Sequence, residues 1–130
     1  MEIIYTKNAP DAIGPYSQAI KIGNMVYTSG QIAIDPATGN VEAADIEGQS
    51  RQVMKNLEAV LKEAGCTFAD VVKTTCFLKD VAKDFAAFNA IYAEAMGDSK
   101  PARSCVGVAE LPKGVLVEVE AIAVCKLAPA

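Results

Sequence analysis

The feature that most constrains the fold is the run at residues 115–125, in which both alternating rows of side chains carry apolar residues. Successive side chains of a β-strand point to opposite faces of the sheet. One row, suited to lie beneath helices, consists of Val115, Val117, Val119, Ala121 and Ala123. The other row consists of Leu116, Glu118, Glu120, Ile122 and Val124. We therefore expect the longest strand of a sheet here, with two faces that both need cover.

Two earlier stretches, residues 46–64 and 82–96, carry apolar side chains at helical spacing, and Gly65 and Gly97 follow them as stop signals. Their apolar faces consist of Val53, Leu57, Val60, Leu61 and Ala64 in the first, and of Phe85, Phe88, Ile91, Tyr92, Ala95 and Met96 in the second. We interpret both stripes as core rather than as contacts for a cofactor.

Five further β-rich runs complete the pattern, at residues 2–6, 17–22, 25–32, 70–79 and 102–109. Gly23-Asn24 predicts a tight hairpin between the second and third runs. The order β-β-β-α-β-α-β-β predicts an α+β fold, with a single six-stranded mixed sheet and two helices on one face. The chain has no linker or repeat, so residues 1–130 are expected to form one domain.

Two helices cannot cover both faces of such a sheet. The second row of the last strand includes Leu, Ile and Val, and an exposed apolar face of this kind marks an interface. We therefore predict a homo-oligomer. The alternation does not give the number of subunits.

The composition excludes several classes of chemistry. The chain contains no histidine, which rules out Ser-His-Asp triads, Cys-His dyads and histidine-based zinc sites. Its 12 basic and 16 acidic residues give a net charge of −4, which argues against a nucleic-acid partner. The N-terminus lacks the features of a secretory signal, and no apolar run approaches the roughly 20 residues of a membrane helix. We expect a cytoplasmic protein without a membrane partner.

The four cysteines form no C-x-x-C pair. A cytoplasmic domain of this size does not need disulfides, so we expect all four to be reduced. Cys66, Cys76 and Cys125 are interpreted as small core residues.

The candidate chemistry lies on the last two predicted strands. Glu118 and Glu120 point to the same side beside apolar neighbours, where a carboxylate needs a cationic partner or a proton, unless both lie at a wet edge. Arg103 and Cys105 share a face of the strand that we expect to neighbour the last one. Arg103 could reach Glu118, or residues of another subunit across an interface. The alternative is an arginine whose stem covers apolar surface while its head lies in water.

Cys105 has no histidine to activate it, so a packed, unreactive thiol is the favoured interpretation. The sequence context of Tyr16, Ser29 and Asn89 says little by itself.

Several motifs together resemble the RidA (YjgF) family. They are Ala12-Ile13-Gly14-Pro15-Tyr16-Ser17-Gln18-Ala19, Thr28-Ser29-Gly30-Gln31 after Gly23-Asn24, Val72-Lys73-Thr74-Thr75, Pro101-Ala102-Arg103-Ser104-Cys105-Val106 and Val117-Glu118-Val119-Glu120-Ala121-Ile122. The last two are the most specific. The resemblance covers essentially the whole chain, and Val119 is a small departure where the family more often has Ile or Met.

The resemblance implies a chorismate-mutase-like fold that assembles as a homotrimer, with sheets facing inward and ligand sites at the subunit interfaces. It also implies hydrolysis of reactive imines and enamines, such as 2-iminobutanoate, 2-iminopropanoate and 2-aminoacrylate, to 2-keto acids and ammonia. Dehydratases that depend on pyridoxal phosphate release these intermediates. The deaminase itself is expected to need no cofactor and no metal.

The resemblance further implies roles for single residues. Arg103 is expected to pair with the substrate carboxylate, and Glu118 to hold the attacking water and pass a proton toward the departing nitrogen. The backbone of Cys105 is expected to bond the substrate, and Glu120 is expected to be structural. The pocket is expected to be lined by Tyr16, Ser29, Gly30 and Asn89.

Two other functions stay open. The same pocket could bind small carboxylates without catalysis, in a regulatory trimer. A ribonuclease activity is attached to parts of the family, and both the absence of histidine and the acidic balance weigh against it. The sequence does not rank the imine substrates or identify a partner enzyme.

Overall fold

A computed structural model describes residues 1–126 of the chain. Its strands are β1 (Glu2–Ile4), β2 (Ala19–Ile22), β3 (Met25–Thr28), β4 (Val71–Leu78), β5 (Ala102–Gly107) and β6 (Val117–Val124). Its helices are α1 (Ile46–Glu63) and α2 (Val81–Met96), with short 3-10 turns at Phe68–Asp70 and Pro112–Gly114.

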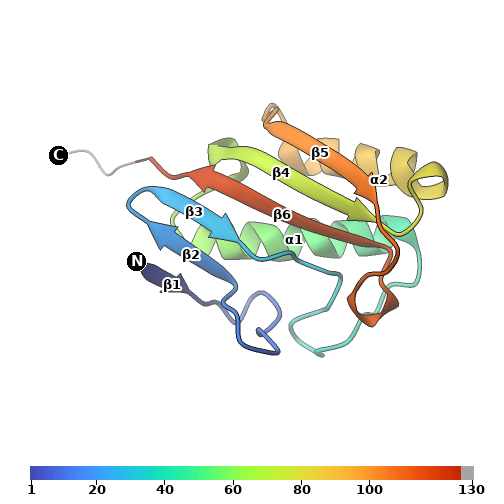
Figure 1. Cartoon of the computed structure of the whole chain (residues 1–130), viewed down its shortest axis with the longest axis horizontal. Helices are drawn as coiled ribbons and strands as arrows, with labels where there is room; N and C mark the ends of the chain where they lie inside the picture. Colours follow the sequence, from blue (N-terminus) through green and yellow to red (C-terminus); the bar gives the residue numbers. More distant parts are fainter. Residues whose placement is uncertain (127–130) are drawn as a thin grey trace.

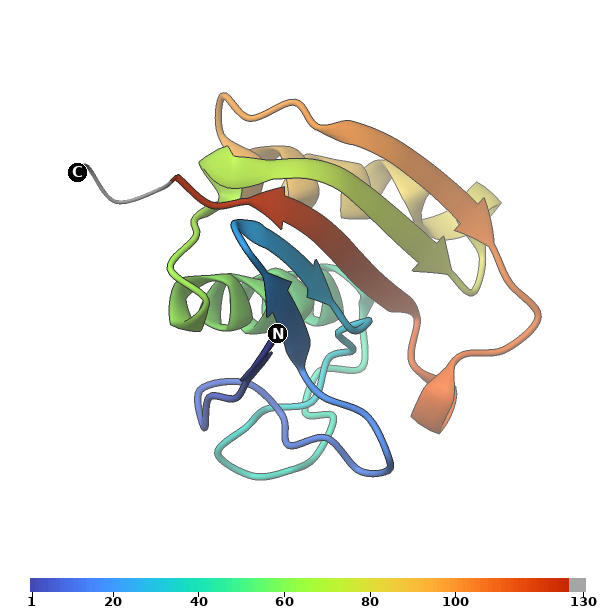
Figure 2. The same cartoon turned by 60° about the vertical axis from the view of Figure 1, so that its left-hand side comes forward.

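The strands form one six-stranded mixed sheet in the order β1-β2-β3-β6-β4-β5. β4 and β5 are parallel, and every other neighbouring pair is antiparallel. Both helices pack against the same face of the sheet (Figure 1), and the view in Figure 2 leaves the opposite face uncovered. The predicted fold class is confirmed.

The helices begin and end where local signals place them. The side chain of Asp45 accepts a hydrogen bond from the backbone N–H of Gly48 and caps α1. Asp80 caps α2 in the same way through Lys83 N–H, and Gly97 ends it with a φ of 61°. The apolar stripe predicted for α1 is buried throughout, and it packs on the inner row of β6.

The largest departure from the predicted topology is the neighbour of β5. We expected this strand to lie beside the last one, but β5 pairs in parallel with β4, and β4 separates it from β6. The physical reason is the connection: α2 lies between β4 and β5 in the chain, and such a crossover returns the strand parallel to the one it left. The other differences are shifts of strand ends by a few residues.

The uncovered face is apolar along much of its width. Residues paired on neighbouring strands point to the same face, so the pairing registers place side chains from all six strands on this face. Its most exposed large apolar side chains are Ile3, Ile22, Tyr27 and Val106. The outer row of β6 is half-buried within the chain, as the alternating burial of that strand shows. Within residues 1–126, no helix is long and apolar enough to cross a membrane.

The expectation that all four cysteines are reduced is wrong for two of them. Cys66 and Cys125 form a disulfide, with Cα atoms 5.1 Å apart. Both side chains are buried, one just after α1 and one at the end of β6. A separation of 59 residues gave no sign of this contact, which arises because the end of β6 lies beside the end of α1. Cys76 and Cys105 are free thiols.

Reduction of this disulfide is expected to lower stability. Closing a loop of this length restricts the unfolded chain and contributes about 4 kcal/mol in the chain-entropy account. Thermal unfolding should therefore show a lower Tm with a phosphine reductant than without it. A Cys66→Ser/Cys125→Ser variant should not respond to the reductant. Four titratable thiols in the denatured, unreduced protein would contradict the pairing.

Candidate functional site

Arg103 lies on β5, at the edge of the sheet, and its guanidinium is held by helix α2. Its Nη1 donates a hydrogen bond to Oδ1 of Asn89 over 2.8 Å. The guanidinium carbon also lies 4.7 Å from the ring centre of Tyr92 and 5.7 Å from that of Phe85. Two of the residues expected in the pocket, Arg103 and Asn89, are thus in contact, and the arginine head is anchored although the residue is exposed.

The spacing along α2 explains why three of its side chains meet Arg103. Phe85, Asn89 and Tyr92 are spaced four and three residues apart, so they lie on one face of the helix. Beside them is a hollow of about 420 Å³, which is also lined by Pro101 and Lys100. A guanidinium has five N–H donors, and Asn89 takes one of them.

Cys105 presents its backbone rather than its thiol to the open edge. The N–H of Val108 bonds to the carbonyl of Leu78 on β4. Because backbone groups alternate along a strand, the N–H and C=O of Cys105 and Arg103 point away from β4, off the sheet edge. Burial raises the pKa of the Cys105 thiol, and the charge of Arg103 offsets this only in part. The thiol is therefore protonated at neutral pH, which favours the unreactive interpretation.

A second group of predicted residues gathers around Glu118 on β6. A Cβ atom placed on Gly30 would lie 2.7 Å from Cδ of Glu118, so the loop passes close to the carboxyl group, and a larger residue here would displace the Glu118 side chain. The next residue of the loop, Gln31, exchanges backbone hydrogen bonds with Val119. Ser29 Oγ donates to the carbonyl of Ser17 over 2.6 Å, which ties the loop to the segment that precedes β2.

Tyr16 lies in the same neighbourhood. It shares with Gly30 a hollow of about 260 Å³ whose rim includes Lys113. Its hydroxyl oxygen accepts a hydrogen bond from the N–H of Ile13, and the side chain is 53% exposed. The ring is therefore available to a ligand or to a neighbouring chain.

Glu118 and Glu120 share the uncovered face, as their spacing predicts. β6 has strands on both sides, so the alternative that both carboxylates lie at a wet edge is wrong. Burial raises the pKa of Glu118, and the negative charge of Glu120 raises it further. Among residues 1–126, neither carboxylate has an ion-pair partner. Glu118 is thus a carboxylate that holds a proton more readily than a free glutamate.

Within one chain, the Arg103 group and the Glu118 group do not meet. Arg103 is aligned with Thr74, which is buried on the helix-covered side of the sheet. Glu118 is aligned with Phe77, three residues further along β4 and on the uncovered side. The hypothesis that Arg103 reaches Glu118 inside one chain is therefore wrong, whereas the alternative of a contact across an interface is compatible with the geometry.

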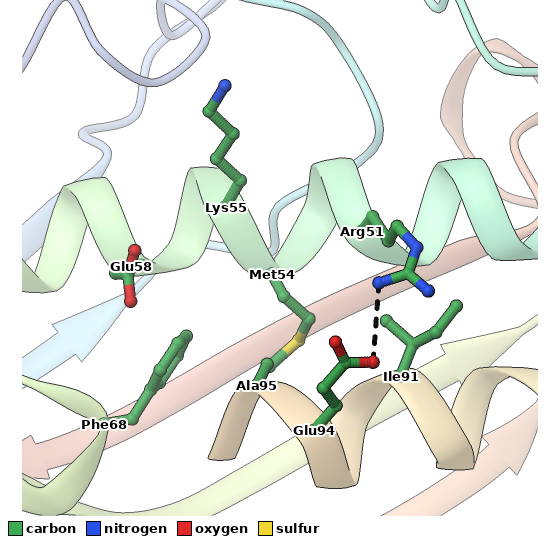
Figure 3. A pocket seen from close by; sticks show the side chains of 8 residues that line it. All are labelled: Arg51, Met54, Lys55, Glu58, Phe68, Ile91, Glu94 and Ala95. Atoms are coloured by element: carbon green, nitrogen blue, oxygen red, sulfur yellow. Dashed lines mark ion pairs between the residues drawn. The ribbon is translucent and has the colours of Figure 1, made fainter. Parts of the chain in front are cut away.

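A third hollow, of about 280 Å³, lies between α1 and α2 (Figure 3). Its rim carries an ion pair between Arg51 and Glu94, with 3.5 Å between the two charged atoms. It contains none of the predicted site residues, and its arginine is already paired. The part of the chain that is described holds no group of three His, Cys, Asp or Glu side chains suited to a metal ion.

Sequence reasoning missed the residues that support the site. The buried Gln18 bonds Thr6 through both its carbonyl oxygen and its amide, and it also donates to the carbonyl of Pro10, which fixes the segment before Tyr16. Tyr92 was interpreted as core alone, although its spacing from Asn89 was a signal that it reaches the same neighbour. No local pattern points to Gln18.

Comparisons with known proteins identify relatives that cover nearly the whole chain. The profile of the family described as Endoribonuclease L-PSP matches residues 6–125. The chain is 56% identical over 122 residues to the RutC family protein PH0854 of Pyrococcus horikoshii, with 94% of this chain and 96% of that protein covered. It is 52% identical over 124 residues to a 2-iminobutanoate/2-iminopropanoate deaminase of Salmonella typhimurium, with 93% and 95% covered.

Two further relatives are informative. A putative regulator AldR of Lactococcus lactis is 52% identical over 126 residues, with 97% of this chain and 99% of that protein covered. The crystal structure of Escherichia coli TdcF with bound serine has a TM-score of 0.91 at 44% identity, with 97% of this chain and 100% of that chain covered.

The carboxyl group of Glu118 is expected to titrate above the ordinary range of a glutamate, because burial and Glu120 both disfavour its charge. The measurement is a carbon NMR titration of the glutamate side chains. In Glu120→Gln, the pKa of Glu118 should fall but stay raised, since burial is the larger cause. An ordinary pKa for Glu118 in the unaltered protein would contradict the geometry.

Proposed function

We propose that this chain, which belongs to the family described as endoribonuclease L-PSP (the RidA or YjgF family), hydrolyses small 2-imino acids to 2-keto acids and ammonia. The observation that carries the proposal is the anchored guanidinium of Arg103 at an open sheet edge, with donors left for a ligand. Identity of 52% to a named deaminase supports the reaction class.

The substrate carboxylate binds Arg103 in this proposal. A guanidinium and a carboxylate form paired, charge-assisted hydrogen bonds, and the planar fork of arginine fixes the direction of the bound acid. Asn89 occupies one donor and leaves the others free. The outward N–H of Cys105, two residues along the same edge, supplies a further donor for the ligand. A small acid held in this way projects its imine carbon beyond the sheet edge.

The site is completed by a second copy of the chain. The proposed assembly is a homotrimer in which the uncovered sheet faces pack inward and the Arg103 group of one subunit meets the Glu118 group of the next. Two observations support it: the uncovered face is apolar, and the two groups lie on opposite faces of one sheet. In the assembly, Tyr16, Ser29 and Gly30 line the pocket from the Glu118 side.

Hydrolysis needs one water molecule and one proton relay. Glu118 accepts a proton from water as the oxygen attacks the imine carbon, and the C=N double bond becomes a single bond in a carbinolamine. The same group returns the proton to nitrogen, which becomes the amine of the carbinolamine. Glu118 then takes the hydroxyl proton and delivers it to that nitrogen as the C–N bond breaks, so ammonia leaves and the C=O bond of the keto acid forms. The raised pKa of Glu118 brings its basicity closer to neutral pH, which suits this exchange. Holding the acid beside a placed water can supply much of the ~7–11 kcal/mol available from proximity.

In this role the protein removes reactive imines that pyridoxal-phosphate-dependent dehydratases release. A cytoplasmic location belongs to the same proposal.

A regulatory carboxylate-binding trimer is the second candidate. It is favoured by the name of the Lactococcus lactis relative, a putative regulator, and by the structure of TdcF with bound serine, which shows a small amino acid bound to a related protein. Both candidates use the same guanidinium. They differ in whether the bound acid is turned over.

Arg103→Ala should lower the rate of imine hydrolysis by at least about a hundredfold, since about 3 kcal/mol of charge-assisted bonding is lost. The assay couples a threonine dehydratase to the protein and follows the release of 2-oxobutanoate above the spontaneous rate. The matched control is Arg51→Ala, another exposed arginine with one partner, which should keep the wild-type rate.

Full activity in Arg103→Ala would contradict both the site and the reaction. A wild-type protein that binds 2-oxobutanoate in calorimetry but leaves its release unaccelerated would instead support the regulatory candidate.

A further inference from the structure

Arg103 belongs to a closed chain of contacts that runs through β4, α2 and β5. Thr74 on β4 hydrogen-bonds Tyr92 on α2, with 2.8 Å between the two hydroxyl oxygens. The ring of Tyr92 lies against the guanidinium of Arg103 on β5. Arg103 is in turn the strand neighbour of Thr74. We propose that Tyr92 is a positioning residue for Arg103 and that Thr74 holds the ring in place. This inference rests on the proposed function, in which Arg103 binds a carboxylate.

The hydrogen bond to Asn89 alone does not fix the guanidinium. One bond through Nη1 leaves the planar group free to rotate about that contact, and β5 has a strand on one side only. The ring centre of Tyr92, at 4.7 Å, is within the distance at which an aromatic face attracts a cation. This contact restrains where the guanidinium, and with it the remaining N–H donors, can lie. Phe85, at 5.7 Å, is the more distant ring.

The orientation of the Tyr92 ring is itself fixed from two sides. Its hydroxyl bonds Thr74, whose side chain is 1% exposed, and its ring packs on Phe88 with centres 5.7 Å apart. Burial raises the pKa of the Tyr92 hydroxyl, so the phenol stays neutral and keeps its hydrogen bond at working pH. Because the ring is fixed by buried neighbours, it restrains the position of the exposed Arg103 side chain.

The contacts predict a graded series of variants. Tyr92→Leu removes the ring, and it should weaken binding of 2-oxobutanoate about tenfold, within the range of cation–π contacts. Tyr92→Phe keeps the ring and should weaken binding less than threefold. Thr74→Val keeps the shape of its side chain and breaks the same hydrogen bond from the other side, so it should likewise weaken binding less than threefold. Phe68→Leu is the matched control, because it removes another buried ring, which lines the hollow between α1 and α2 and makes no aromatic contact with Arg103 or Tyr92.

Three readouts separate positioning from general packing. Calorimetry gives the affinity for 2-oxobutanoate. Kinetics should show KM raised in Tyr92→Leu with kcat nearly unchanged, because Arg103 holds the carboxylate equally before and during the reaction. Proton NMR should show ring-current shifts of the Arg103 side chain that are lost in Tyr92→Leu, retained in Tyr92→Phe and unaffected by Phe68→Leu.

The outcomes distinguish this inference from the proposed function. Wild-type affinity and retained ring-current shifts in Tyr92→Leu would overturn the positioning role while leaving imine hydrolysis intact. A protein that binds 2-oxobutanoate through Arg103 but does not hydrolyse imines would overturn the function, and the affinities of the variants would still decide the inference. Binding that is unaffected by Arg103→Ala, or absent from the wild type, overturns both. If Tyr92→Leu does not fold, the wild-type protein decides, because Arg103 side-chain protons without an upfield ring-current shift overturn the positioning role.

Discussion

The alternation of side chains along β6 is the constraint on which the rest of the structure depends. Its inner row, fully buried, receives helix α1 and closes the core of the chain. The same period of two places Glu118 and Glu120 on the other face, where no helix covers them. Because β6 lies between β3 and β4, these carboxylates are carried by the middle of the sheet rather than by a mobile loop. The alternation along β6 thus both builds the core and places Glu118 where its pKa is raised.

The two halves of the proposed site differ in how they are built. Arg103 is exposed on an edge strand, and its rigidity is supplied by Asn89 and Tyr92 on the packed helix α2. Glu118 is held by the centre of the sheet, and the loop through Gly30 closes over its carboxyl group. In the proposed function, the residues that bind the acid and the residue that transfers the proton therefore come from different faces of one sheet. The proposal thus gives the open apolar face a part in both the chemistry and the assembly.

Local patterns predicted the helices and the two-faced last strand, because each depends on neighbours within a few turns of chain. The candidate site residues came instead from the resemblance to a family. The pairing of β5 with β4 could not be read in this way, since strand order depends on where α2 returns the chain. The disulfide of Cys66 and Cys125 and the close approach of Gly30 to Glu118 are contacts between distant segments. The role of Tyr92 could not be predicted from the apolar stripe of its helix, because this side chain is buried in the core and also contacts Arg103.

The most direct test of a site shared between copies is complementation. Arg103→Ala and Glu118→Gln chains, each impaired alone, are co-expressed in equal amounts and purified as mixed assemblies. Random pairing around a closed ring gives about a quarter of interfaces with both intact groups, so about that fraction of wild-type imine hydrolysis should return. Activity in the mixed assemblies no higher than in the single variants would contradict an arginine and a glutamate that meet between subunits.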